Sequence, residues 1–253
     1  MFEKTIVSFQ DYVDTVLQHD GNTLGYRGVS DKNYKLVPAI GRVSKDRQIH
    51  AMSSEQGMFN DFKKELVRFQ KINTDIECAI LAQHYGLPTR LLDWTFNPLV
   101  ALHFAVNSKT PVDACIYLLS YAIDHMDECD VNYSSLFSEI SFIIEIVNDE
   151  SSPTSLDGKC DPEIGEYDET YYALHPSSTT ERIVAQKSFF TLHCNPFLPI
   201  ENEVHGKLII PHELKKSMQD ALELFGITSY TLFPDISGLA TSLRQAYFSS
   251  TSS

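Results

Sequence analysis

The sequence has few basic residues and no regular cysteine pattern. Its 253 residues include 20 Lys and Arg against 34 Asp and Glu, which gives a formal net charge of -14. This charge repels nucleic acid and anionic membranes, so we expect neither general nucleic-acid binding nor a membrane partner. The five cysteines are widely spaced and form no CxxC pair, which favours reduced, packed residues over a disulfide framework or a zinc site. We therefore expect no bound metal.

Long apolar segments and secretion signals are also missing. The sequence contains no run of about 18 apolar residues, and charges interrupt the apolar positions of its first residues, MFEKTIVSFQDYV, unlike in a signal peptide. These features favour a cytoplasmic protein. The sequence also lacks a P-loop, a GxSxG nucleophile elbow and a paired-carboxylate site with diagnostic spacing. No reaction class follows from a short motif.

The sequence does have enough apolar material for a full core. Hydrophobic residues make up 43% of the chain, and we favour one domain over residues 1–253, with a core from about 22 to 245. Helical patterns interleave with about five or six short strands and no regular βαβ rhythm, which predicts an α+β fold: a mixed, short-stranded sheet with flanking helices. Residues 148–170, rich in acids, Ser, Pro and Gly, are expected to form a solvated acidic insertion.

Capping residues and apolar spacing predict the individual elements. Helix signals are caps such as Ser8 and Asn97, a closing Gly86 or Gly226, and an apolar face. They predict helices that begin at Phe9 and Pro98, helices over 54–72, 75–86, 134–147 and 211–226, and a last helix capped by Asp235. Apolar, β-branched runs predict strands around 22–31, 114–120, 182–186, 189–193, 206–211 and from 227.

The stretch QHYGLPTRLLDWTFNP, residues 83–98, places several polar side chains between two apolar helices. We expect it to form a tight crossing. Arg90 and Asp93 are three residues apart and can form an ion pair if the chain turns, and Trp94 suits a core position with its N–H bonded. We therefore predict structural roles for Asp93 and Trp94, and leave Arg90 open between a clamp and a ligand contact.

Three other residues of this stretch are candidates for a cleft. Gln83 and His84 end the first helix just before the turn, so their side chains can point towards a ligand. A buried His84 that is satisfied within the core is an equally good interpretation. Thr89 either contacts the ligand or braces the turn.

The tripeptide YRG, Tyr26 to Gly28, is a second candidate site. A Gly directly after Arg27 allows a ligand or a second backbone to approach closely. The planar guanidinium suits a phosphate group because it donates two parallel hydrogen bonds. A buried ion pair with Asp93 or Glu181 explains Arg27 equally well, since an isolated buried charge is too costly.

A third candidate is the segment ERIVAQ, residues 181–186. Arg182 and Gln186 are an even number of residues apart, so they share one face if the segment is a strand. The residues alone therefore indicate a polar cleft without a named reaction.

Four motifs, in order along the chain, resemble the FRG domain family: YRG, LAQHYGLPTRLLDWTFNPLVALHFA, ERIVAQKSFFTLH and LFPDISGLA. The resemblance covers roughly residues 25–240. Lys187 and Ser188 depart from it, because the family tends to have a small residue and a Gly there. The family is found widely in bacteria and phages, which implies a role in conflict between them, as a toxin or in phage defence, but it brings no established reaction.

GYRG is also similar to the first-strand motif of Arg-type ADP-ribosyltransferases, whose Arg holds a phosphate of NAD. Glu201 or Glu203 would imitate their acidic catalytic strand. This similarity implies an ADP-ribosyltransferase-like fold with NAD as a co-substrate, and catalytic roles for Arg27, His84 and Glu203. The alternative is a non-catalytic module that senses a nucleotide or a partner. The residues expected to contact the ligand are Tyr26, Gly28, Gln83, Thr89, Arg90, Arg182 and Gln186.

Overall fold

The computed structural model describes residues 1–108, 110–126, 133, 171–176 and 180–249. The acidic insertion expected at 148–170 and the helix expected over 134–147 lie outside the described residues. Among the described helices, none has the length and apolar character needed to cross a membrane.

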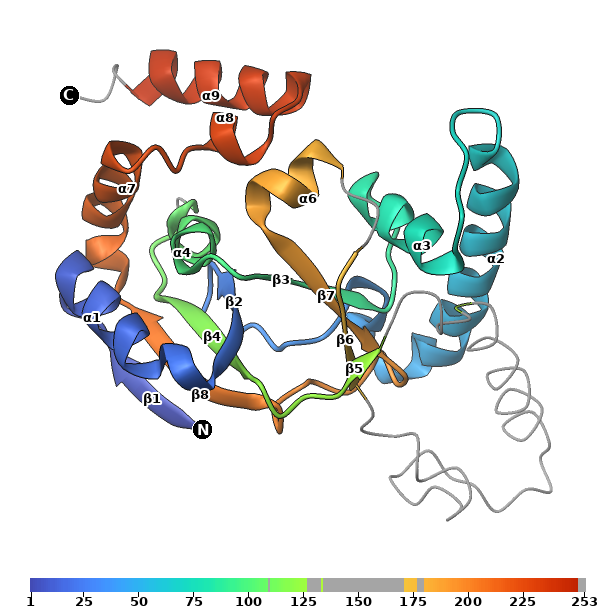
Figure 1. The fold of residues 1–253 in the computed structure, drawn as a ribbon, viewed down its shortest axis with the longest axis horizontal. Helices are drawn as coiled ribbons and strands as arrows, with labels where there is room; N and C mark the ends of the chain where they lie inside the picture. The colour runs from blue at the N-terminus through green and yellow to red at the C-terminus, as the bar shows by residue number, and fades with distance from the viewer. Residues whose placement is uncertain (109, 127–132, 134–170, 177–179, 250–253) are drawn as a thin grey trace.

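A single mixed sheet and its flanking helices confirm the α+β class (Figure 1). The sheet has eight strands in the order β1-β8-β4-β2-β3-β7-β6-β5. Its end pairs, β1 with β8 and β5 with β6, are parallel, and the pairs between them are antiparallel. The strands are β1 (Phe2–Thr5), β2 (Thr23–Val29), β3 (Leu91–Thr95), β4 (Ala114–Ser120), β5 (His125–Met126), β6 (Tyr171–Leu174), β7 (Ser188–His193) and β8 (Val204–Ile210).

The helices pack in two groups against one face of the sheet. In the first group, α1, α4 and α7 cover β2, β4 and β8, and in the second, α2, α3 and α6 cover β3, β6 and β7. The opposite face is closed by loop residues such as Leu36 and Ile200. The helices are α1 (Phe9–His19), α2 (Gln48–Leu66), α3 (Asp75–His84), α4 (Pro98–Val106), α6 (Glu181–Gln186), α7 (Lys215–Leu224), α8 (Ser229–Leu232) and α9 (Ile236–Ser249).

The two halves of the sheet meet at one residue pair. Strand β2 pairs with β4 along its whole length, whereas its pairing with β3 is recorded only at Tyr26 and Thr95. Beyond that pair the two strands separate. Backbone groups and side chains at the separation are therefore available for something other than sheet hydrogen bonds.

The capping signals correctly predicted several helix ends. The Ser8 hydroxyl accepts a hydrogen bond from the Asp11 N–H, and the Asn97 side chain accepts one from the Leu99 N–H. Gly86 and Gly226 have φ angles of 94° and 72°, the left-handed conformation that glycine tolerates at a helix end.

Three predictions of local structure were wrong. Residues 181–186 form helix α6 rather than a strand, because the Thr180 side chain caps the segment and Lys187 closes it in the left-handed conformation. The stretch 83–98 contains strand β3, which pairs with β7, so it is more than a crossing between helices. Residues 229–232 form α8, with a capping box at Thr228, where a strand was expected.

Candidate functional site

A cavity of about 230 Å³ opens where β2 and β3 separate. Its floor comes from β2, β3 and β7, and its walls come from α3, α4 and α6, whose positions Figure 1 shows. The cavity brings together most residues that the sequence singled out, from segments far apart in the chain. They are Tyr26, Arg27, Gly28, Gln83, His84, Asp93, Trp94, Arg182 and Gln186.

Arg27 bridges the two separating strands. Its Nη1 donates a hydrogen bond of 2.5 Å to the carbonyl of Asp93 and lies 3.5 Å from the carboxylate of the same residue. The guanidinium thus satisfies a backbone group of β3 near the end of the pairing between the strands. Burial lowers the pKa of Arg27, and the Asp93 carboxylate opposes that shift. Of the two interpretations of Arg27, the ion pair with Asp93 is confirmed.

Asp93 presents an oriented carboxylate to the cavity. Gln83 Nε2 donates to Asp93 Oδ1 at 2.6 Å, and the Thr89 hydroxyl donates in turn to Gln83 Oε1. The Asp93 side chain is nevertheless 58% exposed. Gln83 and Arg27 therefore fix its direction, with Thr89 holding Gln83, and they leave room for a ligand. Thr89 itself does not line the cavity and acts through Gln83.

Arg182 and His84 line the wall of the cavity opposite the sheet, and Arg182 carries its positive charge. Burial lowers the pKa of His84, the positive charge of Arg182 lowers it further, and Asp235 opposes the shift. The Arg182 guanidinium lies 4.7 Å from the centroid of the Phe233 ring, which also meets Phe104 edge-on. A cation–π contact of this kind leaves the donors of Arg182 free to bind an anion.

Gln186 anchors this wall to its surroundings. The side-chain Nε2 of Gln186 donates to the Leu232 carbonyl at 3.0 Å. The backbone carbonyl of Gln186 accepts from the Thr95 hydroxyl at 2.6 Å. In helix α6 Arg182 and Gln186 are one turn apart, so they share a face although the segment is not a strand. The predicted strand was therefore wrong, but the prediction that Arg182 and Gln186 share one face is confirmed.

Gly28 is required by a second backbone rather than by a ligand. A Cβ atom at this position would lie 1.8 Å from the Ala101 carbonyl oxygen of α4. The helix backbone thus occupies the space that the missing side chain leaves. Gly28 and the α4 residue Phe104 both line the cavity, so this close packing of β2 against α4 forms one edge of the cavity.

Trp94 occupies a core position with a bonded N–H, as the sequence predicted, and it also lines the cavity. Its side chain is buried, and Nε1 donates to the Thr191 hydroxyl at 3.0 Å. The expected pair between Arg90 and Asp93 is wrong. Arg90 is 1% exposed and pairs with Glu55 of α2 at 2.7 Å, so its guanidinium does not reach the cavity.

Glu203 does not lie beside the cavity either. It precedes β8, where its carbonyl accepts from the Ser120 N–H at 2.8 Å. Ser120 pairs with Thr23 at the start of β2, whereas Arg27 lies towards the end of that strand. The structure therefore separates Glu203 from Arg27 and His84, with β4 between β8 and β2.

Several lining residues were not predicted from the sequence: Ile80, Thr95, Phe104, Ile183, Ser188 and Phe190. Most are apolar positions on helices or strands, where a core role and a cavity-lining role give the same pattern. Thr95 lies within the stretch 83–98 and Phe104 lies a few residues after it, so proximity to that stretch was the available signal.

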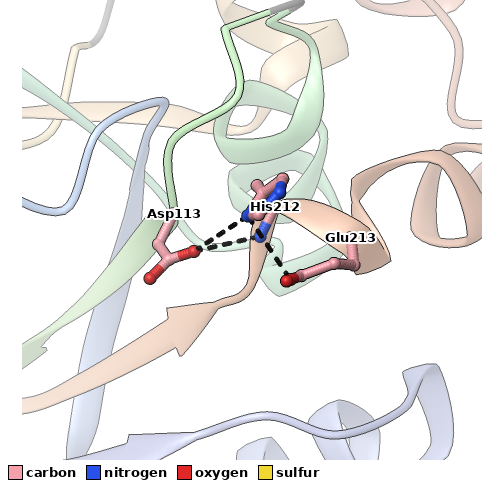
Figure 2. Close-up of side chains that lie close together, drawn as sticks. All are labelled: Asp113, His212 and Glu213. Carbon is pink, nitrogen blue, oxygen red and sulfur yellow. Dashed lines mark hydrogen bonds and ion pairs between the residues drawn. The ribbon is translucent and has the colours of Figure 1, made fainter.

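One group of metal-binding residue types lies outside the cavity: Asp113, His212 and Glu213 (Figure 2). Their geometry indicates a structural role. Asp113 Oδ1 accepts from the His212 N–H at 3.1 Å, and the Lys32 ammonium occupies Asp113 Oδ2 at 2.9 Å. An ammonium already bound to the carboxylate opposes a metal cation. These contacts join the start of β4 to the turn before α7.

Comparison with known proteins supports one family. The model of the FRG domain matches residues 22–114, which include Arg27, the stretch 83–98 and helix α4. This part of the chain is therefore similar to FRG domains. No curated protein and no solved structure matches the chain.

Proposed function

We propose that the cavity binds a small ligand that carries phosphate, such as part of a nucleotide. The observation that carries this proposal is the gathering of two arginines, Arg27 and Arg182, in one cavity of a chain with a net charge of -14, with the ring of His84 beside them. Among the described lining residues Asp93 is the one acid. A local excess of positive charge against an acidic background favours an anion at this place.

Arg182 is the main anion contact in this proposal. Arg27 already donates a hydrogen bond to the Asp93 carbonyl. Its contribution to ligand binding is therefore its positive charge near the phosphate rather than hydrogen bonds to it. His84 adds a second contact, because a bound phosphate would raise its pKa and favour the protonated ring. Aromatic side chains at Phe104 and Phe190 offer apolar surface for the rest of the ligand.

The size of the cavity limits the ligand. Its volume of about 230 Å³ lies below the range of about 300–1,000 Å³ typical of sites for drug-sized ligands. A phosphate with one sugar or one small ring fits this space better than a whole dinucleotide. A larger ligand would extend from the cavity into solvent.

A transfer reaction that uses NAD is the more specific form of this proposal, and the resemblance to ADP-ribosyltransferases supports it. The resemblance to FRG domains supports a role in conflict between bacteria and phages. The transfer reaction needs a carboxylate to stabilise the positive charge that develops on the ribose. Because Glu203 lies elsewhere, Asp93 is the carboxylate that this cavity could supply. The alternative function is binding without turnover, as in a sensing module.

Isothermal titration with AMP, ribose 5-phosphate and NAD tests the binding proposal. We expect Arg182→Gln to weaken the binding of each ligand by about 10-fold or more, since a hydrogen bond to a charged group contributes about 1.5–3 kcal/mol. Arg68→Gln is the matched control, because Arg68 is exposed on the surface and pairs with Glu65. Equal affinities of the two variants, or no binding by the unmodified protein, would overturn the proposal.

Turnover is measured separately. Release of nicotinamide from NAD, lost in Asp93→Asn and kept in Arg68→Gln, would support the transferase. Binding of AMP or ribose 5-phosphate with NAD left intact would support the sensing module.

A further inference from the structure

We propose that Asp93 recognises ribose hydroxyl groups, so that the ligand is a ribose phosphate or a ribonucleotide rather than a deoxyribonucleotide or another phosphate ester. This inference rests on the proposed function, because it assumes that phosphate binds at Arg182 and His84. It concerns a different contact, the carboxylate on the floor of the cavity.

The placement of Asp93 is unusual for an anion site. A carboxylate beside a bound phosphate repels it, so a site for phosphate alone would be better without Asp93. Yet Asp93 is held in place by Gln83 Nε2 at 2.6 Å, and Gln83 is held by Thr89. The Asp93 side chain keeps 58% of its surface exposed. An oriented acceptor with free surface indicates a ligand group that donates hydrogen bonds.

The surrounding charges decide what kind of donor this is. A carboxylate accepts hydrogen bonds from hydroxyls or from an ammonium group. The Arg27 guanidinium already lies 3.5 Å from Asp93 Oδ2, and the Arg182 guanidinium lines the same cavity. A ligand ammonium would meet these positive charges, whereas a neutral hydroxyl would not. The charges therefore favour neutral donors.

A ribose provides such donors next to a phosphate. Its 2′ and 3′ hydroxyls are adjacent, so both can donate to one carboxylate, in the way that an acidic residue binds the ribose in dinucleotide-binding folds. The cavity volume of about 230 Å³ suits a sugar with its phosphate. Asp93 on β3 and Arg182 on α6 then bind the two ends of one small ligand.

The first test uses the unmodified protein and changes the ligand. We expect AMP to bind about 10-fold more tightly than 2′-deoxy-AMP, because the missing 2′ hydroxyl takes away one of the two hydrogen bonds to the carboxylate. Equal affinities would overturn the inference while Arg182-dependent binding of both ligands left the proposed function standing. Loss of all binding would overturn both.

The second test changes Asp93. In Asp93→Asn we expect the preference for AMP over 2′-deoxy-AMP to fall towards one, while both ligands still bind. A thermal melt of each variant checks that the fold is kept, and Arg68→Gln is the control that should retain the preference. An unchanged preference in a folded Asp93→Asn protein would contradict the inference. Tighter binding of phosphoethanolamine than of ribose 5-phosphate would also contradict the inference, because it would show that the Asp93 carboxylate binds a cation.

Discussion

Arg90 and Glu55 form a buried ion pair that fixes the stretch 83–98 to helix α2. The Arg90 Nη2 lies 2.7 Å from Glu55 Oε2, and the two side chains are 1% and 2% exposed. The backbone N–H of Arg90 also donates to Glu55 Oε1, at 3.0 Å, and so does the Tyr133 hydroxyl, at 2.7 Å. One carboxylate therefore satisfies both the side chain and the backbone of Arg90. The start of β3 is held by the core, and the cavity lies at its other end.

Replacement of Arg90 should lower stability strongly. In Arg90→Ala the Glu55 carboxylate is left buried without its cation, and we expect the free energy of unfolding to fall by about 3–5 kcal/mol. Urea denaturation measures this change. Arg68→Gln, on the exposed surface, should change it by less than about 0.5 kcal/mol. A stable Arg90→Ala protein that has lost binding of AMP would contradict the structural role.

Gly28→Ala should also destabilise the protein. The new Cβ would lie 1.8 Å from the Ala101 carbonyl oxygen, so α4 would have to move away from β2. We expect a loss of about 1–3 kcal/mol, as for other overpacked cores. Gly57→Ala is the control, because Gly57 lies within α2 and a Cβ there meets nothing within 4 Å. That variant should be more stable by about 0.5–1 kcal/mol.

Lys187→Gly should stabilise the protein. Lys187 closes α6 with a φ of 46°, and it is the one described residue other than glycine with a positive φ. Glycine removes the steric cost of that conformation, about 1–2 kcal/mol, but loses more chain entropy on folding. We expect a net gain of about 0.5–1 kcal/mol in thermal or urea unfolding.

The matched control for Lys187→Gly is Lys64→Gly. Lys64 is exposed in α2, where glycine should cost about 1 kcal/mol. If both variants lose stability to the same extent, the left-handed conformation of Lys187 is not a source of strain.

The helix ends were the most predictable part of the fold, because they depend on local chemistry. Ser8, Asn97, Gly86 and Gly226 act within a few residues of themselves, and each lies where the pattern placed it. Strand β3 was missed for the opposite reason. Its residues become a strand by pairing with β7, nearly 100 residues later in the chain. No local alternation of apolar and polar residues predicts that pairing.

The candidate site shows the same division. Most of the polar residues that the sequence singled out line one cavity. The sequence did not indicate their partners. Arg90 and Arg27 are both arginines in conspicuous motifs, but Glu55 buries one and Asp93 holds the other at the cavity. A partner 35 or 66 residues away is set by tertiary structure, which spacing along the chain does not predict.

Two buried histidines should make stability depend on pH. Burial lowers the pKa of His103 to about 4 and that of His193 to about 3, whereas an unfolded chain binds the proton at about pH 6.5. The unfolded state therefore takes up protons first, and the stability present above pH 6.5 is lost as the pH falls towards 4. Each histidine should lower the free energy of unfolding by about 1.4 kcal/mol per pH unit in that window.

Urea titrations between pH 7 and 4 measure this dependence, and His103→Gln isolates one contribution. His103 lies on α4, 3.4 Å from the Asn107 side chain, and a glutamine keeps a polar group there without the titration. We expect the slope of this variant to be smaller by about 1.4 kcal/mol per pH unit. Arg68→Gln, an exposed substitution that removes no histidine, should leave the slope unchanged. If His103→Gln keeps the original slope, His103 takes up its proton in the folded protein as readily as in the unfolded chain, and its burial does not govern the acid sensitivity.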